Sequence, residues 1–275
     1  MRFRPPAGYL AAALLPLAAY TISGTASGAY RLGTPARAVA AEPSVAHGTR
    51  GVGEAAPRPF ESATLAVDAA LEALLPTVTR MSDAEALRTA FGAYFKYREA
   101  YPDRVRNPYL YFVDLGLDNR TPRGYVFDME ALEVVDGPFM VSHGRGSDRA
   151  GEGIPSAFSN QPGSKASSLG LYLAEETYGF SGKSGGRAYR SVGLRLRGES
   201  GEFNSAARAR GIVAHGATYV NGTRAGRSEG CPAMEAHRAE RLLPMLSNGG
   251  VVFLYSPNDA RWLAEDPWVG MATDD

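Results

Sequence analysis

One cysteine is the residue of this sequence best suited to nucleophilic chemistry. Cys231 is the single cysteine among 275 residues, and it lies in the segment Arg-Ser-Glu-Gly-Cys-Pro at 227–232. The chain begins with a pattern typical of export signals. A lone thiol in an exported protein cannot form an internal disulfide, so it is incidental, pairs with another molecule, or reacts. Its neighbours favour a reactive thiol.

The residues beside the thiol predict the start of a helix. Pro232 suits the first helical position, where its missing N–H is not needed, and 233–247 has the apolar spacing of a helix. A thiol at the N-terminus of that helix would have a lowered pKa. Gly230 permits a positive φ, and the amides of Gly230 and Cys231 could bind a developing oxyanion. The alternative is a small, buried, inert cysteine.

A nucleophilic thiol needs a base, and the chain offers four histidines. His47 lies in a segment without apolar periodicity, and His237 lies six residues after the cysteine on the expected helix, so it points elsewhere. His215 and His143 each follow a short apolar strand and precede a glycine. Either could be a structural residue, but two such histidines and one thiol favour a converging site.

Zinc binding is the other chemistry open to cysteine and histidine. The sequence has no Cys-x-x-Cys, His-x-His or His-Glu-x-x-His pattern, so the ligand spacing of a zinc site is missing. We therefore expect no metal and no cofactor.

Short strands separated by turns must position these residues. From Pro108 onward, apolar runs bounded by Asn, Pro, Asp and Gly predict a β-rich α+β fold. The expected strands are 109–114, 124–129, 139–142, about 169–173, about 192–197, 211–215 and 250–256. The segment 144–201 is otherwise dense in Gly and Ser, and 233–247 is expected to be helical.

The N-terminal part has a different texture. Residues 1–29 resemble a signal peptide, since Arg2 and Arg4 precede a fourteen-residue apolar run, which is shorter than the roughly 20 residues that span a bilayer. Residues 30–59 have the composition of a disordered linker. Leucine spacing predicts a helix at about 61–75, and Ser-Asp-Ala-Glu at 82–85 resembles a capping box that opens a second one. We expect a helical hairpin at 60–104 and a periplasmic or secreted protein with no stable membrane span after signal cleavage.

Charge and composition exclude few classes of function. The formal net charge is zero, so no overall positive field favours nucleic acid as a partner. Lysine occurs at only three positions, and the many arginines reflect either a GC-rich genome or carboxylate binding. The 44% of hydrophobic residues is enough for one sizeable core or two small ones.

The motifs together resemble a known family. Ile-Val-Ala-His-Gly-Ala at 212–217, followed by Gly-Arg-Ser-Glu-Gly-Cys-Pro-Ala at 226–233, is similar to the L,D-transpeptidase catalytic domain of the YkuD type. Val-Ser-His-Gly at 141–144, Phe-Ser-Asn at 158–160, 167–172 and Phe-Asn at 203–204 also resemble its murein L,D-transpeptidase branch. The similarity runs from about Tyr109 to Ser256. The order of the motifs, His before Cys, is opposite to that of papain-like and NlpC-type peptidases.

The resemblance implies a YkuD-like catalytic domain at 105–258, followed by a C-terminal tail at 259–275. It implies that Cys231 is the nucleophile, that His215 is its acid–base partner, and that the Gly216 carbonyl orients the imidazole. The amides of Gly230 and Cys231 would then bind the oxyanion. The implied partners are peptidoglycan stem peptides, cleaved between meso-diaminopimelate and D-alanine, with a thioester resolved by an amine or by water.

The sequence departs from the common motif of the family at two positions. Glu229 stands where a histidine is usual, and Ala233 stands where Arg or Asn is usual. Arg227 could bind a substrate carboxylate instead, and we place Ser228 and His143 with it as expected substrate-binding residues. The alternatives to a transferase are an L,D-carboxypeptidase or endopeptidase that uses the same thiol, and a non-catalytic peptidoglycan-binding protein.

Overall fold

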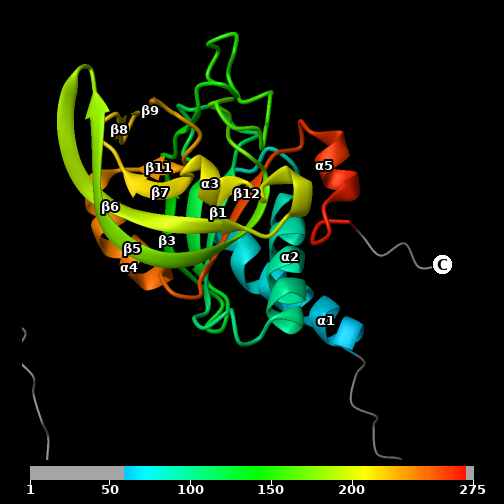
Figure 1. The fold of residues 1–275 in the computed structure, drawn as a ribbon. Coiled ribbons are helices and arrows are strands. Elements are labelled where there is room, and N and C mark those ends of the chain that lie inside the picture. Colours follow the sequence, from blue (N-terminus) through cyan, green and yellow to red (C-terminus); the bar gives the residue numbers. More distant parts are fainter. Residues whose placement is uncertain (1–58, 271–275) are drawn as a thin grey trace, which may run out of the picture. The chain divides into compact units, whose positions relative to one another are not determined.

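The computed structural model describes residues 59–270, which form a mixed β-sheet with helices packed against it (Figure 1). The signal expected at 1–29 lies outside the described residues, as do residues 30–58 of the linker expected at 30–59, and Pro59 is already the first residue of a helix. Among residues 59–270, no helix is both long and apolar enough to cross a membrane. The predicted β-rich α+β fold with an N-terminal helical segment is confirmed.

Eight strands form the main sheet, in the order β11-β7-β6-β5-β12-β1-β2-β3. Their bounds are β1 Tyr109–Asp114, β2 Gly124–Asp128, β3 Glu133–Phe139, β5 Gly170–Ser184, β6 Arg187–Gly198, β7 Val213–Gly216, β11 Ala233–Met234 and β12 Val251–Tyr255. Two small sheets pair β4 (His143–Gly144) with β10 (Arg227–Ser228), and β8 (Val220–Asn221) with β9 (Arg224–Ala225).

The centre of the sheet is buried on both faces. β1 and β12 pair in parallel, and β12 is buried along its whole length. Their sequences, Tyr-Leu-Tyr-Phe-Val-Asp and Val-Val-Phe-Leu-Tyr, are nearly continuous apolar runs, which is typical of strands covered on both sides. These strands therefore form the interior of the domain.

The β5–β6 hairpin is longer than the sequence suggested. We expected two short strands within 144–201, whereas β5 has 15 residues and β6 has 12. Gly185 and Gly186 form the two-residue turn with φ values of +55° and +80°, as a tight hairpin turn requires. The outer half of the hairpin extends past the core and is rich in Gly and Ser, so it has no apolar run to reveal it (Figure 1).

The helices cover the sheet and share its core. They are α1 Pro59–Leu74, the 3₁₀ turn η1 Leu75–Thr77, α2 Ala86–Ala100, the 3₁₀ turn η2 Gly201–Phe203, α3 Ala207–Arg210, α4 Ala236–Leu246 and α5 Ala260–Glu265. α1 packs against α2, and α2 contacts β1 and β12. Buried side chains of both helices belong to the same hydrophobic core as the sheet.

The capping box expected at 82–85 does not cap α2. Ser82 instead turns toward the sheet, where its amide and hydroxyl donate to the Asp114 carboxylate at 2.7 and 2.6 Å. The N-cap residue is Glu85, and its side chain makes no capping hydrogen bond. A buried carboxylate at the end of β1 thus competes successfully for the serine, because a buried acceptor without a donor is costly.

The segment expected as a C-terminal tail contains α5. The Asp259 carboxylate caps this helix by accepting from the Trp262 amide at 3.0 Å. Trp262 is fully buried, and its indole N–H donates to Asp266 at 2.7 Å. This segment therefore packs on the domain through a tryptophan.

Candidate active site

Pairing with β7 positions the thiol segment. β11 lies parallel to β7, with Ala233 opposite His215, so Cys231 is carried to the sheet edge beside that histidine. α4 begins only at Ala236, after the N-cap residue Glu235. The expectation that Cys231 starts a helix is therefore wrong. The backbone after Pro232 first satisfies its hydrogen bonds by joining the sheet, and the helix follows that strand.

A compact hydrogen-bonded loop holds Cys231. The Ser228 hydroxyl donates to the Cys231 carbonyl at 2.7 Å and accepts from the Gly230 amide at 3.1 Å. The Ser142 hydroxyl also donates to the Cys231 carbonyl, at 3.3 Å. Gly230 has a φ of +129°, and a Cβ there would lie 2.9 Å from the Ala166 carbonyl oxygen, so the loop requires glycine.

The ring of His215 is fixed on two sides. Its Nδ1 lies 3.0 Å from the Gly216 carbonyl oxygen, which can only accept, so Nδ1 carries the proton and Nε2 holds the lone pair. Phe180 of β5 stacks on the imidazole with ring centroids 4.0 Å apart and an interplanar angle of 18°. Burial lowers the pKa of His215 to about 4, against the opposing effect of the Gly216 hydrogen bond. The imidazole is therefore neutral at pH 7.

The thiol of Cys231 is also neutral at rest. The residue is half-buried, and its Sγ lies 3.9 Å from the Gly211 carbonyl oxygen. Desolvation raises the pKa of the thiol to about 11, while the Val213 amide and the Arg210 charge oppose the rise. The lowered thiol pKa expected at a helix start is therefore wrong, because the sheet-edge position provides no helix dipole.

One cavity of about 310 Å³ exposes both groups. Its lining includes His215, Cys231 and Gly211, together with Arg227, Ser228 and Glu229. The β5–β6 hairpin and the segment after β7 add side chains that the sequence analysis missed: Tyr178, Phe180, Lys183, Tyr189 and Tyr219. Residues 178, 180 and 182 lie on the same face of a strand, so the alternation of Tyr178, Phe180 and Gly182 was the sequence signal that could have placed these side chains together.

Arg210 is a further residue that the sequence analysis missed. Its guanidinium donates to the carbonyls of Ser159 and Ala166, each at 2.7 Å, and to the hydroxyls of Ser168 and Ser164 at 3.2 and 3.1 Å. These contacts join the end of α3 to the 159–168 segment, which packs against the thiol loop at Gly230. The same guanidinium is close enough to lower the pKa of the thiol. No local motif marks this arginine, because its partners lie about forty to fifty residues away in the sequence.

This geometry coincides with a family match. The family described as L,D-transpeptidase catalytic domain matches residues 79–255, which include α2, the whole main sheet and the Cys231 loop. The chain belongs to the L,D-transpeptidase catalytic-domain family. The match begins at residue 79, inside the segment 60–104 that we assigned to a helical hairpin. This agrees with the structure, in which α2 shares a hydrophobic core with the sheet.

Several solved L,D-transpeptidase structures are similar to this chain. One from Mycobacterium smegmatis has 15% identity and a TM-score of 0.32, and the similarity covers 54% of this chain and 58% of that one. One from Stackebrandtia nassauensis has 14% identity and a TM-score of 0.34, with 70% and 92% covered. One from Xylanimonas cellulosilytica has 15% identity and a TM-score of 0.32, with 59% and 69% covered. The chain thus spans just over half of the first of these relatives, and no curated protein matches it.

Within this L,D-transpeptidase domain, His143 does not reach the cavity. Its ring is fully buried, and its Nδ1 accepts from the Arg123 guanidinium at 2.8 Å. Nε2 lies 3.7 Å from Asp148 and has no hydrogen-bond partner among residues 59–270. Burial and the Arg123 charge lower the pKa of His143 to about 3. We expected a substrate contact here, and the structure places a neutral interior histidine instead.

The other expected substrate-binding residues do line the cavity. Arg227 is half exposed and donates to the Asp148 backbone carbonyl at 3.3 Å. Ser228 is buried, and its hydroxyl is used within the thiol loop. Glu229 points to solvent and pairs with Arg145 at 2.9 Å and with Lys165 at 3.6 Å.

The two amides expected to bind an oxyanion differ in their availability. The Gly230 amide already donates to the Ser228 hydroxyl. The Cys231 amide has no hydrogen-bond partner in the part of the chain that the structure describes. No group of three or more His, Cys, Asp and Glu side chains within 59–270 is arranged to hold a metal ion.

Proposed function

We propose that this chain is an exported cysteine acyltransferase that acts on peptidoglycan stem peptides through a thioester on Cys231. The observation that carries the proposal is that Cys231 and His215 share one cavity, where the imidazole Nδ1 is held by the Gly216 carbonyl. That hydrogen bond leaves Nε2 as the only basic nitrogen of the ring. Membership of the L,D-transpeptidase family supports the substrate class.

In the first step, Sγ of Cys231 attacks the carbonyl carbon between diaminopimelate and D-alanine, and the thiol proton passes to Nε2 of His215. Because both groups are neutral at pH 7, this proton moves during the attack rather than before it. The unpartnered Cys231 amide is a donor for the tetrahedral oxyanion. Collapse breaks the C–N bond, Nε2 returns the proton to the amine of D-alanine, and a thioester remains.

In the second step, the amine of another stem peptide attacks the thioester. His215 takes a proton from that amine and returns it to the sulfur as the thiol leaves. The half-exposed Arg227 at the rim is suited to bind a carboxylate of either peptide. The aromatic side chains of the hairpin line the same cavity, and we propose that they limit the access of water to the thioester and so favour transfer over hydrolysis.

Covalent labelling tests the nucleophile. The purified protein, incubated with a carbapenem, should gain the mass of one adduct, because a β-lactam carbonyl acylates an accessible nucleophilic thiol. Cys231→Ala should gain none, and His215→Ala should react at least 100-fold more slowly than wild type, in line with the loss of a general base. Equal labelling of Cys231→Ala would refute the nucleophile assignment.

Product analysis tests the reaction. With tetrapeptide muropeptides, cross-linked dimers and free D-alanine are expected. Tripeptide products without dimers would identify a carboxypeptidase that uses the same thiol. Binding of muropeptides without any turnover would identify a non-catalytic protein. A fusion of residues 1–58 to a reporter should be exported if the N-terminal segment is a signal.

A further inference from the structure

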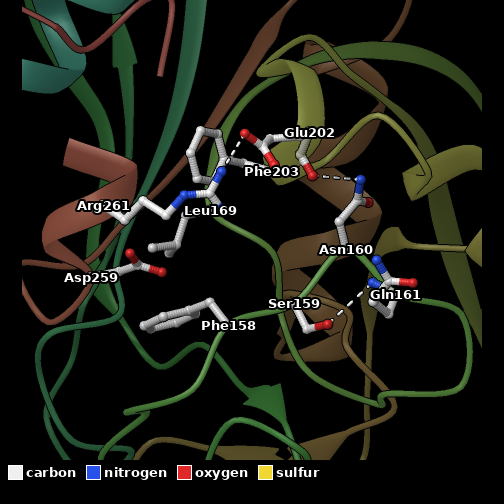
Figure 2. A pocket seen from close by; sticks show the side chains of 9 residues that line it. All are labelled: Phe158, Ser159, Asn160, Gln161, Leu169, Glu202, Phe203, Asp259 and Arg261. Carbon is white, nitrogen blue, oxygen red and sulfur yellow. Dashed lines mark hydrogen bonds and ion pairs between the residues drawn. The ribbon is translucent and has the colours of Figure 1, made fainter. Parts of the chain in front are cut away.

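A second cavity, distinct from the Cys231 site, lies between the 158–169 segment, the turn η2 and the start of α5 (Figure 2). Its volume is about 200 Å³. This is below the about 300–1,000 Å³ of sites that hold drug-sized ligands, so it suits a single ring or a short side chain. The proposed reaction uses none of the side chains that line it.

Three apolar side chains line this cavity, Phe158, Leu169 and Phe203. Figure 2 shows Phe158 and Phe203 at its two ends with Leu169 between them. Leu169 is buried, whereas both phenylalanines are partly exposed and so present ring surface to the cavity. Arg261 covers one face of Phe203, with its guanidinium carbon 5.4 Å from the ring centroid. Phe158 is therefore the ring left free to stack on a ligand.

The rim of the cavity carries both donors and acceptors. The Gln161 side-chain amide makes no hydrogen bond within residues 59–270. Asp259 uses one carboxylate oxygen to cap α5, and Glu202 uses one to pair with Arg261, which leaves one free oxygen on each. These groups can accept from hydroxyl groups and donate to them.

The loop behind the rim is held in place. The side-chain amide of Asn160 fixes the loop. Its nitrogen donates to the Glu202 backbone carbonyl at 2.9 Å and to the Ser205 hydroxyl at 3.2 Å, and its oxygen accepts from the Ala206 backbone amide at 3.0 Å. Figure 2 shows this side chain bridging toward Glu202. The cavity wall is thus organised before any ligand arrives, which lowers the entropic cost of binding.

Charge selects the class of ligand. Glu202 and Asp259 place two negative charges against the single positive charge of Arg261, so the rim has a net charge of −1. An anionic ligand, such as a phosphate or a peptide carboxylate, is repelled. A neutral ring with an apolar C–H face and hydroxyl groups at its edge matches the phenylalanine surface and the polar rim together.

We propose that this cavity binds one neutral pyranose unit, an N-acetylated amino sugar of the glycan strand that carries the stem peptides. The sugar would stack its C–H face on Phe158 and bond its hydroxyls to Gln161, Glu202 and Asp259. This proposal rests on the proposed function, because it concerns the polymer to which the peptide substrate is attached.

The two sites share a structural wall. Ser159 lines the sugar cavity, and its carbonyl accepts from Arg210 at 2.7 Å. The same guanidinium binds the Ala166 carbonyl, which packs against Gly230 of the thiol loop. On this proposal, a glycan bound beside this shared segment holds its attached peptide on the same side of the domain as the thiol loop and raises the local concentration of substrate at Cys231.

Titration of the full chain with the tetramer of N-acetylglucosamine tests the proposal. We expect saturable binding with a Kd of about 1 mM, observed by NMR as shifts of the 158–161 and 202–203 signals. Gln161→Ala should weaken binding at least fivefold without unfolding the protein, since that side chain is exposed and makes no hydrogen bond. Glu72→Ala, at an exposed position on α1, is the matched control and should bind as wild type does.

Three outcomes overturn the proposal. The first is that the tetramer does not bind at concentrations up to about 20 mM. The second is that Gln161→Ala binds the tetramer as tightly as wild type does. The third is that N-acetyl-lysine amide binds in place of the sugar, which would identify an amine site. A kinetic comparison separates this idea from the proposed function. Gln161→Ala should raise the KM for glycan-linked peptide at least threefold and leave unchanged both the KM for free stem peptide and the carbapenem labelling of Cys231. If the carbapenem does not label Cys231 in the wild-type protein, the proposed function is refuted, while the sugar titration still tests the second cavity.

Discussion

Replacement of Arg210 by methionine removes a guanidinium that serves both the stability and the charge of the candidate site. The side chain donates to the Ser159 and Ala166 carbonyls at 2.7 Å and to two serine hydroxyls. A hydrogen bond from a charged donor contributes about 1.5–3 kcal/mol. The two carbonyls are only partly buried, so water can replace the lost donor. We therefore assign about 1.5 kcal/mol to each of these two hydrogen bonds and expect the free energy of unfolding to fall by about 3 kcal/mol. For a domain of this size, that corresponds to a decrease in Tm of about 6–12 °C.

The same substitution also changes the reactivity of the thiol. The positive charge of Arg210 lowers the pKa of Cys231, so its removal disfavours the thiolate that forms during attack. A nearby opposite charge shifts such an equilibrium by about tenfold or more. Carbapenem acylation, followed by intact-protein mass spectrometry at pH 8, should therefore slow by about tenfold.

Two further variants separate charge from packing. Arg210→Lys keeps the charge but cannot make four hydrogen bonds, so its Tm should fall while its acylation rate stays within about threefold of wild type. Arg208→Met, on the same short helix, removes an exposed arginine that pairs with Glu175 and Glu176, and it is the control. A Tm within 2 °C and a rate within twofold of wild type for Arg210→Met would refute this reasoning.

Four other predictions follow from the site. Gly230→Ala should abolish carbapenem labelling while a folded circular dichroism spectrum persists, because its φ of +129° and the adjacent carbonyl exclude a Cβ; normal labelling would contradict this. Phe180→Ala should raise the pKa of His215 from about 4 toward its ordinary value, because water then reaches the ring; an unchanged NMR titration would count against the desolvation argument. The rate of Cys231 acylation should show no inflection between pH 6 and 7, because the imidazole titrates near pH 4, and an acid limb centred near 6.5 would disprove a neutral buried base. Finally, His143 and His215 stay neutral in the folded protein down to about pH 3 and 4, whereas in the unfolded chain they take up protons below about 6.5. The folded protein should therefore lose stability as the pH is lowered, by about 3 kcal/mol between pH 6.5 and 5, and urea unfolding with equal free energies at both values would refute that linkage.

Much of the fold could be predicted because its signals are local. The apolar runs of β1 and β12 identify buried strands, and the family motifs around His215 and Cys231 stand out within a few residues. The length of the β5–β6 hairpin could not be predicted, because its outer half is rich in Gly and Ser and carries only the short alternation of Tyr178 and Phe180. The helix start at Pro232 was wrong for a related reason, since pairing with β7 overrides a local helix signal.

The sequence by itself determined the family, the β-rich fold and the candidate pair of a lone thiol and a histidine before glycine, because residue type and spacing carry that information. Only the tertiary structure decided the electrostatic state of that pair. Burial under Phe180 keeps the imidazole of His215 neutral, and burial at the sheet edge keeps the thiol of Cys231 neutral. A position at the start of a helix would have favoured the thiolate. The structure alone also decided that His143 is bound by Arg123 in the interior, and that Arg210 supports the thiol loop. These features depend on desolvation and on contacts between segments far apart in the chain, and local sequence patterns do not encode either.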